Sequence, residues 1–100
     1  MGAFVYLLRC ADGSLYCGWS VDLARRVAAH RAGTASRYTS ARRPVEIAAA
    51  WSAPDRSTAM RLEWAVKQLA RPQKDALVSG TARLPGARRL SQKAVASANG

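Results

Sequence analysis

The stretch that decides the fold is FVYLLRCADGSLYCGWSVDLARRVAAH, residues 4–30. It holds two runs rich in apolar, aromatic and β-branched residues, 4–10 and 14–20, with Ala-Asp-Gly at 11–13 between them. Two such runs separated by a short loop that contains glycine are typical of a β-hairpin. The last ten residues, VDLARRVAAH, have the spacing of an amphipathic helix. We therefore predict a hairpin that leads directly into a helix.

The length of the hairpin loop decides which side chains share a face of the sheet. A two-residue Asp-Gly turn would pair Tyr6 with Trp19 and would leave Tyr6 and Tyr16 on opposite faces. A three-residue loop, with Gly13 left-handed in a bulge, pairs Tyr6 with Gly18 and brings both tyrosines to one face. We predict the three-residue loop, in which Gly18 leaves open space beside Tyr6.

A helix is predicted over 23–31, because Asp22 can cap its N-terminus and Gly33 follows its end. Its periodicity brings Arg26 and His30, four residues apart, to the side that also carries its apolar residues. An arginine and a histidine that look inward together indicate a site. An ordinary helix surface with a hydrogen-bonded histidine is the alternative interpretation of the same pattern.

The rest of the chain adds one strand and two helices. Residues 45–53, VEIAAAWSA, indicate a third strand, and 57–70 and 72–79 indicate two further helices. We therefore predict an α/β (α+β) fold for a domain of residues 1–80: a three-stranded antiparallel β-sheet with three flanking helices, in the order ββαβαα. Residues 81–100 are basic and rich in small residues, and we expect a flexible tail there.

The net charge points to a polyanionic partner. The 100 residues carry 16 Lys and Arg against 6 Asp and Glu, which gives a formal net charge of +10. A basic surface attracts phosphate groups and releases their counterions, although a generic basic protein would show the same excess. The densest basic segment, 25–43, holds six arginines and no acid. We predict DNA contacts from Arg25, Arg31, Arg37, Tyr38, Arg42 and Arg43.

Several other classes of protein fit the sequence poorly. The longest apolar runs are too short to span a bilayer, and no strongly amphipathic basic helix indicates a membrane surface. We expect a cytoplasmic protein, because there is no export signal and two cysteines then read as reduced thiols. One histidine and two cysteines cannot build a structural zinc site without an unusual ligand set. No serine stands in a nucleophile elbow.

One acidic residue has no local structural role. Glu63 lies in the middle of the second predicted helix, on the border of its apolar stripe. A carboxylate in such a place favours a cationic partner, either an arginine or a hard divalent metal ion. A salt bridge to Arg61 or Lys67 is the structural alternative, so Glu63 is a candidate metal ligand on this pattern alone.

Short motifs between Phe4 and Val78 resemble the GIY-YIG nuclease family, most closely its small single-domain bacterial members. They are Phe4-Val5-Tyr6, Tyr16-Cys17-Gly18, Asp22-Leu23-Ala24-Arg25-Arg26 with His30, Ser36-Arg37-Tyr38-Thr39, Arg42-Arg43-Pro44 and Glu63. The first tripeptide keeps only the tyrosine of Gly-Ile-Tyr, and the second has Cys in place of Ile. Many members also place an Asn on the last helix, and 72–79 contain none.

The resemblance implies roles for five side chains. One of Tyr6 and Tyr16 would help to deprotonate the attacking water, and the other would orient that water or the scissile phosphate. Arg26 would neutralise charge on the phosphate, and His30 would hydrogen-bond the phosphate or assist a tyrosine. Glu63 would hold Mg²⁺ or Mn²⁺. A tyrosine with a free pKa of about 10 is a poor base, so a nearby cation would have to lower that pKa.

We therefore predict an enzyme: a metal-dependent nuclease that hydrolyses DNA phosphodiester bonds, endonucleolytically or exonucleolytically. A single domain without a second sequence reader favours selectivity for DNA structure or for single strands. Tyr38, Trp51 and Trp64 could stack on unpaired bases, although packing within the fold would also explain them. Two alternatives remain, a nucleic-acid-binding module that does not cut and a subunit that cuts only with a partner.

Overall fold

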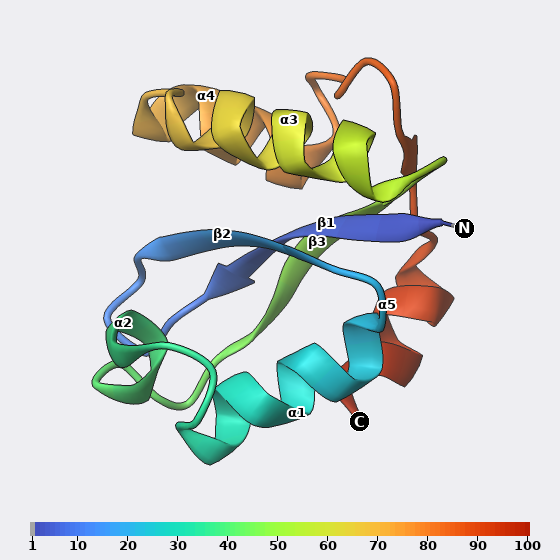
Figure 1. The fold of residues 1–100 in the computed structure, drawn as a ribbon. Helices are drawn as coiled ribbons and strands as arrows, with labels where there is room; N and C mark the ends of the chain where they lie inside the picture. The colour runs from blue at the N-terminus through green and yellow to red at the C-terminus, as the bar shows by residue number, and fades with distance from the viewer. Residues whose placement is uncertain (1) are drawn as a thin grey trace.

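The computed structural model describes residues 2–100, and its helices and strands form three layers. In chain order the elements are β1 (Ala3–Arg9), β2 (Leu15–Ser20), α1 (Leu23–Ala32), α2 (Arg37–Ser40), β3 (Glu46–Ala53), α3 (Arg56–Lys67), α4 (Arg71–Ser79), β4 (Arg88–Arg89) and α5 (Gln92–Asn99). Figure 1 shows the sheet in the middle, with α3 and α4 on one side and α1 and α5 on the other.

The sheet is antiparallel throughout and has the strand order β2-β1-β3-β4. The predicted α+β class with an antiparallel sheet is therefore confirmed. The predicted count of three strands and three helices was incomplete, because residues 2–100 also form the two-residue strand β4 and the helices α2 and α5. These elements are short and lack the periodicity that reveals longer ones, so packing against the rest of the fold determines them.

The hairpin has the predicted three-residue loop. The backbone N–H of Cys10 donates to the carbonyl oxygen of Ser14 at 2.9 Å, which closes the loop. Gly13 has φ of 83°, in the left-handed region that a residue with a Cβ rarely adopts. In this register Tyr6 lies opposite Gly18. Both tyrosines of the hairpin consequently lie on one face of the sheet.

The two faces of the sheet pack against different helices and differ in chemistry. The face that we call the tyrosine face lies against α1 and α5 and is marked by Tyr6, Leu8, Tyr16 and Gly18. The opposite face, which we call the apolar face, lies against α3 and α4 and is marked by Val5, Leu7, Cys17, Ala49 and Trp51. A bulge in β3 at Ala48 moves Ile47 to the tyrosine face and Ala49 to the apolar face, so both sides of β3 bury apolar residues.

Side-chain caps fix where the two main helices begin. The carboxylate of Asp22 accepts the backbone N–H of Arg25 at 3.1 Å at the start of α1. The carboxylate of Asp55 accepts the backbone N–H of Thr58 at 2.7 Å at the start of α3. The predicted cap at Asp22 is thus confirmed. The two cysteines are free and lie on opposite faces of the sheet.

The C-terminal segment extends the sheet and covers part of the tyrosine face. β4 pairs with β3, and the side chain of Asn99 accepts the backbone N–H of Ile47 at 2.7 Å. The guanidinium of Arg89 donates to the carbonyl oxygens of Leu77 and Val78 at the end of α4. The predicted domain boundary at residue 80 and the flexible tail after it stay predictions, although 81–100 contribute β4 and α5 to the fold.

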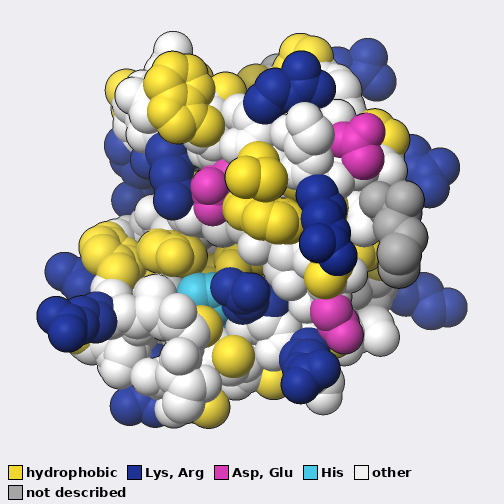
Figure 2. All heavy atoms as spheres, viewed as in Figure 1, with side chains coloured by type: hydrophobic (Ala, Val, Ile, Leu, Met, Phe, Trp, Pro, Cys, Tyr) yellow, Lys and Arg dark blue, Asp and Glu magenta, His cyan; other side chains and the backbone are white. Residues whose placement is uncertain are grey.

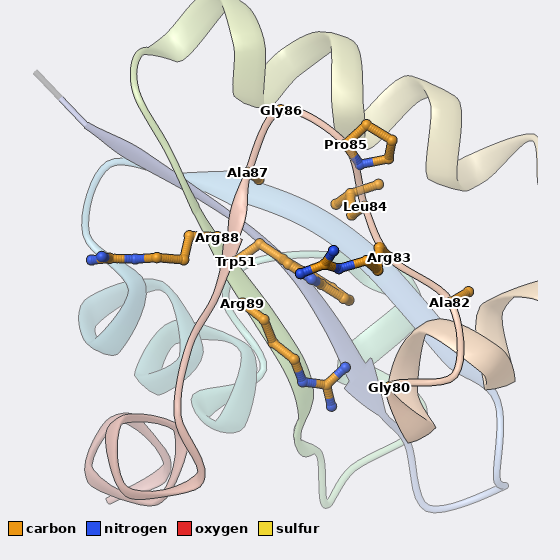
Figure 3. Close-up of a pocket in the computed structure, with 10 residues that line it drawn as sticks. All are labelled: Trp51, Gly80, Ala82, Arg83, Leu84, Pro85, Gly86, Ala87, Arg88 and Arg89. Carbon is orange, nitrogen blue, oxygen red and sulfur yellow. The ribbon is translucent and has the colours of Figure 1, made fainter.

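The same segment encloses a cavity of about 610 Å³ at the β4 edge of the sheet. Figure 3 shows Arg83 extending towards Trp51 and Arg88 pointing away from it, and the guanidinium carbon of Arg89 lies 5.8 Å from the centroid of the Trp51 ring. Trp51 is only 2% exposed, so its ring packs inside the fold and is not available to stack on a base. The interpretation of Trp51 as a stacking platform was therefore wrong, because the C-terminal segment covers it.

Candidate active site

The site begins with Tyr6 on β1, the first strand of the hairpin, and with Gly18, which lies opposite it on β2. The Tyr6 hydroxyl lies 2.9 Å from Nε2 of His30, and its side chain is buried. A Cβ on Gly18 would lie 2.6 Å from Cζ of Tyr6, closer than real side chains approach. Glycine at 18 therefore lets the tyrosine ring lie across the neighbouring strand, as the hairpin register predicts.

His30 is held on both sides of its ring. Its Nδ1 lies 2.8 Å from Oγ1 of Thr39, and the Thr39 hydroxyl lies 2.9 Å from Oγ of Ser36. Ser36 is also the N-cap of α2, because its Oγ accepts the backbone N–H of Thr39. His30 is 1% exposed, so this histidine has both ring nitrogens satisfied within the fold.

The electrostatics of the pair keep both groups neutral near pH 7. Burial, and next the positive charge of Arg26, lower the pKa of His30 from 6.5 to about 4. Burial, and next the neighbouring Tyr16, raise the pKa of the Tyr6 hydroxyl. Arg26 opposes this increase and Glu63 adds to it, so both charges lie close enough to act on the Tyr6 hydroxyl.

Tyr16 and Tyr38 form one wall of the site. The ring of Tyr16 packs edge-on against His30 with centroids 5.2 Å apart, and it stacks on Tyr38 with centroids 5.7 Å apart. The guanidinium of Arg42 lies 3.8 Å from the centroid of Tyr38 and forms an ion pair with Asp12 at 3.1 Å. These contacts tie the hairpin loop and α2 to the tyrosine face.

Arg26 lies at the open side of the site. It is exposed, so the prediction that it looks inward with the apolar residues of α1 was wrong; a long basic side chain can keep its charged end in water even beside an apolar stripe. It borders a surface cavity of about 310 Å³ that is also lined by Trp19 and Arg56. Figure 2 shows the histidine side chain, in cyan, through an opening between hydrophobic and basic side chains on this side of the molecule.

Glu63, the predicted metal ligand, lies in the layer on the other side of the sheet. It lies on α3, its side chain is 22% exposed, and its carboxylate is 3.6 Å from Nζ of Lys67. The thiol of Cys17 on β2 donates to the Glu63 carbonyl oxygen at 3.9 Å, which places this turn of α3 against the hairpin. An ion pair with an exposed lysine is weak, so the carboxylate can exchange Lys67 for another cation.

The predicted DNA-contacting residues lie on α1 and on the loop and helix that follow it. Within the described chain, the side chains of Arg25 and Arg37 are exposed and form no hydrogen bond or ion pair. Arg31, Arg42 and Arg43 donate to carbonyl or side-chain oxygens of neighbouring segments. Tyr38 is 37% exposed and is already stacked on Tyr16.

Three residues near the site received no role from the sequence, although Ser36 and Thr39 belong to one of the motifs that carry the family resemblance. Thr39 and Ser36 complete the hydrogen bonds of His30, and Arg56 adds a second positive charge beside Arg26. The N-cap pattern of Ser36 three residues before Thr39 was the available signal for the first two. None of the helices that the structure describes is long and apolar enough to cross a membrane.

A hairpin with two tyrosines on one face, a buried histidine and a helix arginine define this chain as a small α+β catalytic domain. Residues 2–76 match the family model described as the GIY-YIG catalytic domain. The chain belongs to the GIY-YIG family, which is a family of nucleases. The membership supports hydrolysis of phosphodiester bonds and binding of nucleic acid in general terms.

Curated relatives and one solved structure agree with this membership. The chain is 43% identical over 79 residues to UPF0213 protein BH0048 of Halalkalibacterium halodurans, a match covering 79% of this chain and 84% of that protein. It is 46% identical over 81 residues to UPF0213 protein XCC3072 of Xanthomonas campestris, covering 81% and 79%. The solution NMR structure of UPF0213 protein BH0048 from Bacillus halodurans matches with a TM-score of 0.53 and 42% identity, over 86% of this chain and 87% of that one.

Proposed function

We propose that this protein is a metal-dependent nuclease that hydrolyses DNA phosphodiester bonds at the tyrosine face. The observation that carries the proposal is the placement of the Tyr6 hydroxyl. It is bonded to a neutral histidine, and the charges of Arg26 and Glu63 both act on it. A tyrosine that is influenced by both a cation and a carboxylate able to hold a metal is suited to activate water beside a phosphate.

Each side chain of the site has a separate role in phosphodiester hydrolysis. Tyr6, with His30 behind it, accepts a proton from the attacking water, and Tyr16 orients that water or the scissile phosphate. Arg26 is exposed at the open side, so its guanidinium can contact phosphoryl oxygens and neutralise the charge that develops there. The positive charges of Arg26 and of a metal ion held by Glu63 would also offset the burial that disfavours a negative charge on Tyr6.

The donor set fits Mg²⁺ or Mn²⁺ held by Glu63. Among the described residues, no group of three or more His, Cys, Asp and Glu could enclose a metal ion. Mg²⁺ commonly binds through one or two carboxylates, keeps several waters and takes the remaining ligands from substrate phosphates. Such a metal, when bound, would supply a Lewis acid that polarises phosphoryl oxygen.

The surface around the site favours single-stranded or branched DNA as the substrate. Arg25 and Arg37 flank the site with uncommitted positive charge, and Trp64, one residue after Glu63, is 66% exposed. An exposed indole can stack on an unpaired base of any sequence. We place the enzyme in the cytoplasm, because both of its cysteines are free thiols.

The test is a cleavage assay with labelled single-stranded, duplex and branched DNA, in Mg²⁺, in Mn²⁺ and in chelator. We expect cleavage with metal, none with chelator, and the highest rate on single-stranded or branched DNA. Glu63→Gln and Arg26→Ala should each lower the rate about 100-fold or more. Glu46→Gln and Arg71→Ala, which remove exposed charges outside the site, serve as matched controls.

The outcomes separate the proposal from its alternatives. Tight binding of all three DNAs without cleavage would favour a binding module. Cleavage only after addition of a cell extract would favour a subunit that needs a partner. Full activity of folded Glu63→Gln and Arg26→Ala would show that the active site lies elsewhere.

A further inference from the structure

The hydrogen bonds behind Tyr6 form a continuous chain that leads away from the substrate side. It runs from the Tyr6 hydroxyl to His30 at 2.9 Å, from His30 to Thr39 at 2.8 Å and from Thr39 to Ser36 at 2.9 Å. Tyr6, His30 and Thr39 are all buried. Among residues 2–100, no buried side-chain nitrogen or oxygen lacks a hydrogen-bond partner. Each polar group in this series of hydrogen bonds is therefore bonded to its neighbours.

The direction of the donors follows from the first link. A neutral Tyr6 can donate its hydroxyl proton to Nε2 of His30, its one hydrogen-bond partner within residues 2–100. A neutral imidazole that accepts at Nε2 carries its proton on Nδ1, and this N–H donates to the Thr39 hydroxyl. The Thr39 hydroxyl in turn donates to Oγ of Ser36.

The far end of the chain reaches solvent. Ser36 is half-buried and lines a surface cavity of about 310 Å³ on the outer side of α2, together with Gly33, Arg37 and Ser40. Its own hydroxyl proton is free to point into that cavity, because its Oγ already accepts from the Thr39 backbone N–H. The chain therefore joins the site to water at a second place.

We propose that Thr39 and Ser36 are positioning residues that extend the Tyr6–His30 pair into a proton path, which carries the proton of the attacking water to solvent at Ser36. This proposal rests on the nuclease function proposed above. It goes beyond that function because it gives two residues of α2 and its cap a part in the reaction without contact to DNA.

The path removes a difficulty in using Tyr6 as a base. Tyr6 could give its proton to His30, but burial and the positive charge of Arg26 both oppose an imidazolium. The titratable groups that influence the pKa of the Tyr6 hydroxyl are Tyr16 and Cys17 on β2, Arg26 on α1 and Glu63 on α3. If the Nδ1 proton leaves as the Nε2 proton arrives, His30 is neutral before and after the step.

The step balances as follows. An O–H bond of water breaks as its oxygen attacks phosphorus, and the proton passes to the Tyr6 oxygen. The Tyr6 proton moves to Nε2, the Nδ1 proton moves to Thr39, and the Thr39 proton moves to Ser36. The Ser36 proton passes to a solvent water. One proton has left the site, and every donor in the chain has reversed its direction.

The first test reads the proton order directly and needs no activity. His30 is the one histidine of the sequence, so the ¹⁵N signals of its ring are assigned without ambiguity in a chain that carries no histidine tag. At neutral pH we expect a protonated Nδ1 and an unprotonated Nε2. Thr39→Val, which replaces the hydroxyl by a methyl group, should reduce the share of this tautomer, and Thr39→Ser should restore it. A wild-type protein with protonated Nε2 would overturn the proposal.

The second test follows the path during turnover on the DNA that the wild type cleaves. General acid–base catalysis typically contributes about 10²–10⁴-fold, and the path supports only part of it, so we expect Thr39→Val to lower kcat about tenfold or more with KM unchanged. The solvent deuterium isotope effect on kcat should fall with it, and Thr39→Ser should restore both. Equal kcat and isotope effect in wild type and Thr39→Val would contradict the path, as would an equal loss in Thr39→Ser.

A third variant keeps the test decisive if Thr39→Val does not fold. Ser36→Gly removes the hydroxyl but leaves a residue that is tolerated at an N-cap, and it should lower kcat and the isotope effect. Ser40→Ala is the matched control, because Ser40 lines the same cavity but takes no part in the series of hydrogen bonds from Tyr6 to Ser36. Wild-type values in Ser36→Gly would overturn the proposal. If the wild type cleaves no DNA, the nuclease function fails, and the ¹⁵N experiment alone decides the proton order.

Discussion

The two faces of strand β1 carry opposite chemistry within a few ångströms of each other. Val5 and Leu7 point to the apolar face and pack between α3 and α4 with no polar partner. Tyr6, which lies between them in sequence, points to the tyrosine face and begins a chain of buried hydrogen bonds. The tyrosine face thus carries, beside its own apolar core, a network of buried hydrogen bonds that the apolar face lacks.

This difference matters because the two kinds of burial contribute differently to stability. Apolar burial stabilises the fold in proportion to the area removed from water. A buried hydrogen-bonded network contributes little net stability, and it becomes costly as soon as one partner is lost. A face built from such a network is therefore best explained by its chemistry, and mutations on the two faces should have different signatures.

The largest expected effect on stability belongs to the apolar face. Leu7→Ala removes a fully buried side chain between β1 and its covering helices and should lower the free energy of unfolding by about 2–5 kcal/mol. Urea unfolding followed by circular dichroism measures this, with Met60→Ala on the exposed side of α3 as the control. A loss of less than about 1 kcal/mol would contradict the assignment of stability to this face.

The next expected effect is a dependence of stability on pH that arises from His30 on the tyrosine face. Because the pKa of His30 is about 4 in the folded state and 6.5 when unfolded, the unfolded state gains a proton first as pH falls. The stability that His30 contributes is complete above pH 6.5 and is lost between 6.5 and 4, by up to about 3 kcal/mol. Urea unfolding across this range measures it.

His30→Gln is the matched variant for the pH experiment, and its stability should be flatter between pH 6.5 and 4. Titration of Asp12 and Asp55 contributes little to the change in stability between pH 6.5 and 4, because their hydrogen bonds lower the pKa of each carboxyl below its ordinary value. An identical pH dependence in wild type and His30→Gln would show that His30 is not held neutral by the fold.

A smaller change in stability should accompany a large local change at the hairpin. Gly18→Ala places a Cβ where the Tyr6 ring lies, so the ring must move away from β2. Overpacking of this kind costs about 1–3 kcal/mol. The ¹⁵N signals of His30 should shift as well, because the bond from Tyr6 to Nε2 is disturbed. Unchanged ring signals in a folded Gly18→Ala would contradict the close approach of Tyr6 to Gly18.

The smallest expected effect concerns the helix that covers part of the tyrosine face. Asn99→Ala removes the side chain that bonds the backbone of Ile47 and should lower the free energy of unfolding by about 1 kcal/mol. Gln92→Ala, at the exposed start of α5, is the control. Wild-type stability of Asn99→Ala would indicate that α5 does not dock on β3 in solution.

Much of the site could be predicted from the sequence because local rules determine its parts. The hairpin loop and the register that pairs Tyr6 with Gly18 follow from loop length and from the position of one glycine. The helix cap at Asp22 follows from residue type. The roles of the five predicted site residues remain predictions, although the charges of Arg26 and Glu63 both influence the pKa of Tyr6.

The parts that the sequence did not reveal depend on contacts between distant segments. β4 and α5 form against β3 through Trp51, Ile47 and Asn99, and no local pattern announces these contacts. The bulge at Ala48 changes which residues of β3 face each side, and a run of alanines hides it. Thr39 lies in a polar loop and gains its importance only when α2 brings it to His30.

The most direct test of the tyrosine face as the catalytic face is the single-turnover cleavage rate of Tyr6→Phe with Mg²⁺. This change removes one oxygen and leaves the ring packed over Gly18, so the fold should be kept. The account predicts a rate about 100-fold or more below wild type, with circular dichroism and DNA affinity unchanged. A Tyr6→Phe protein that cleaves at the wild-type rate would contradict it.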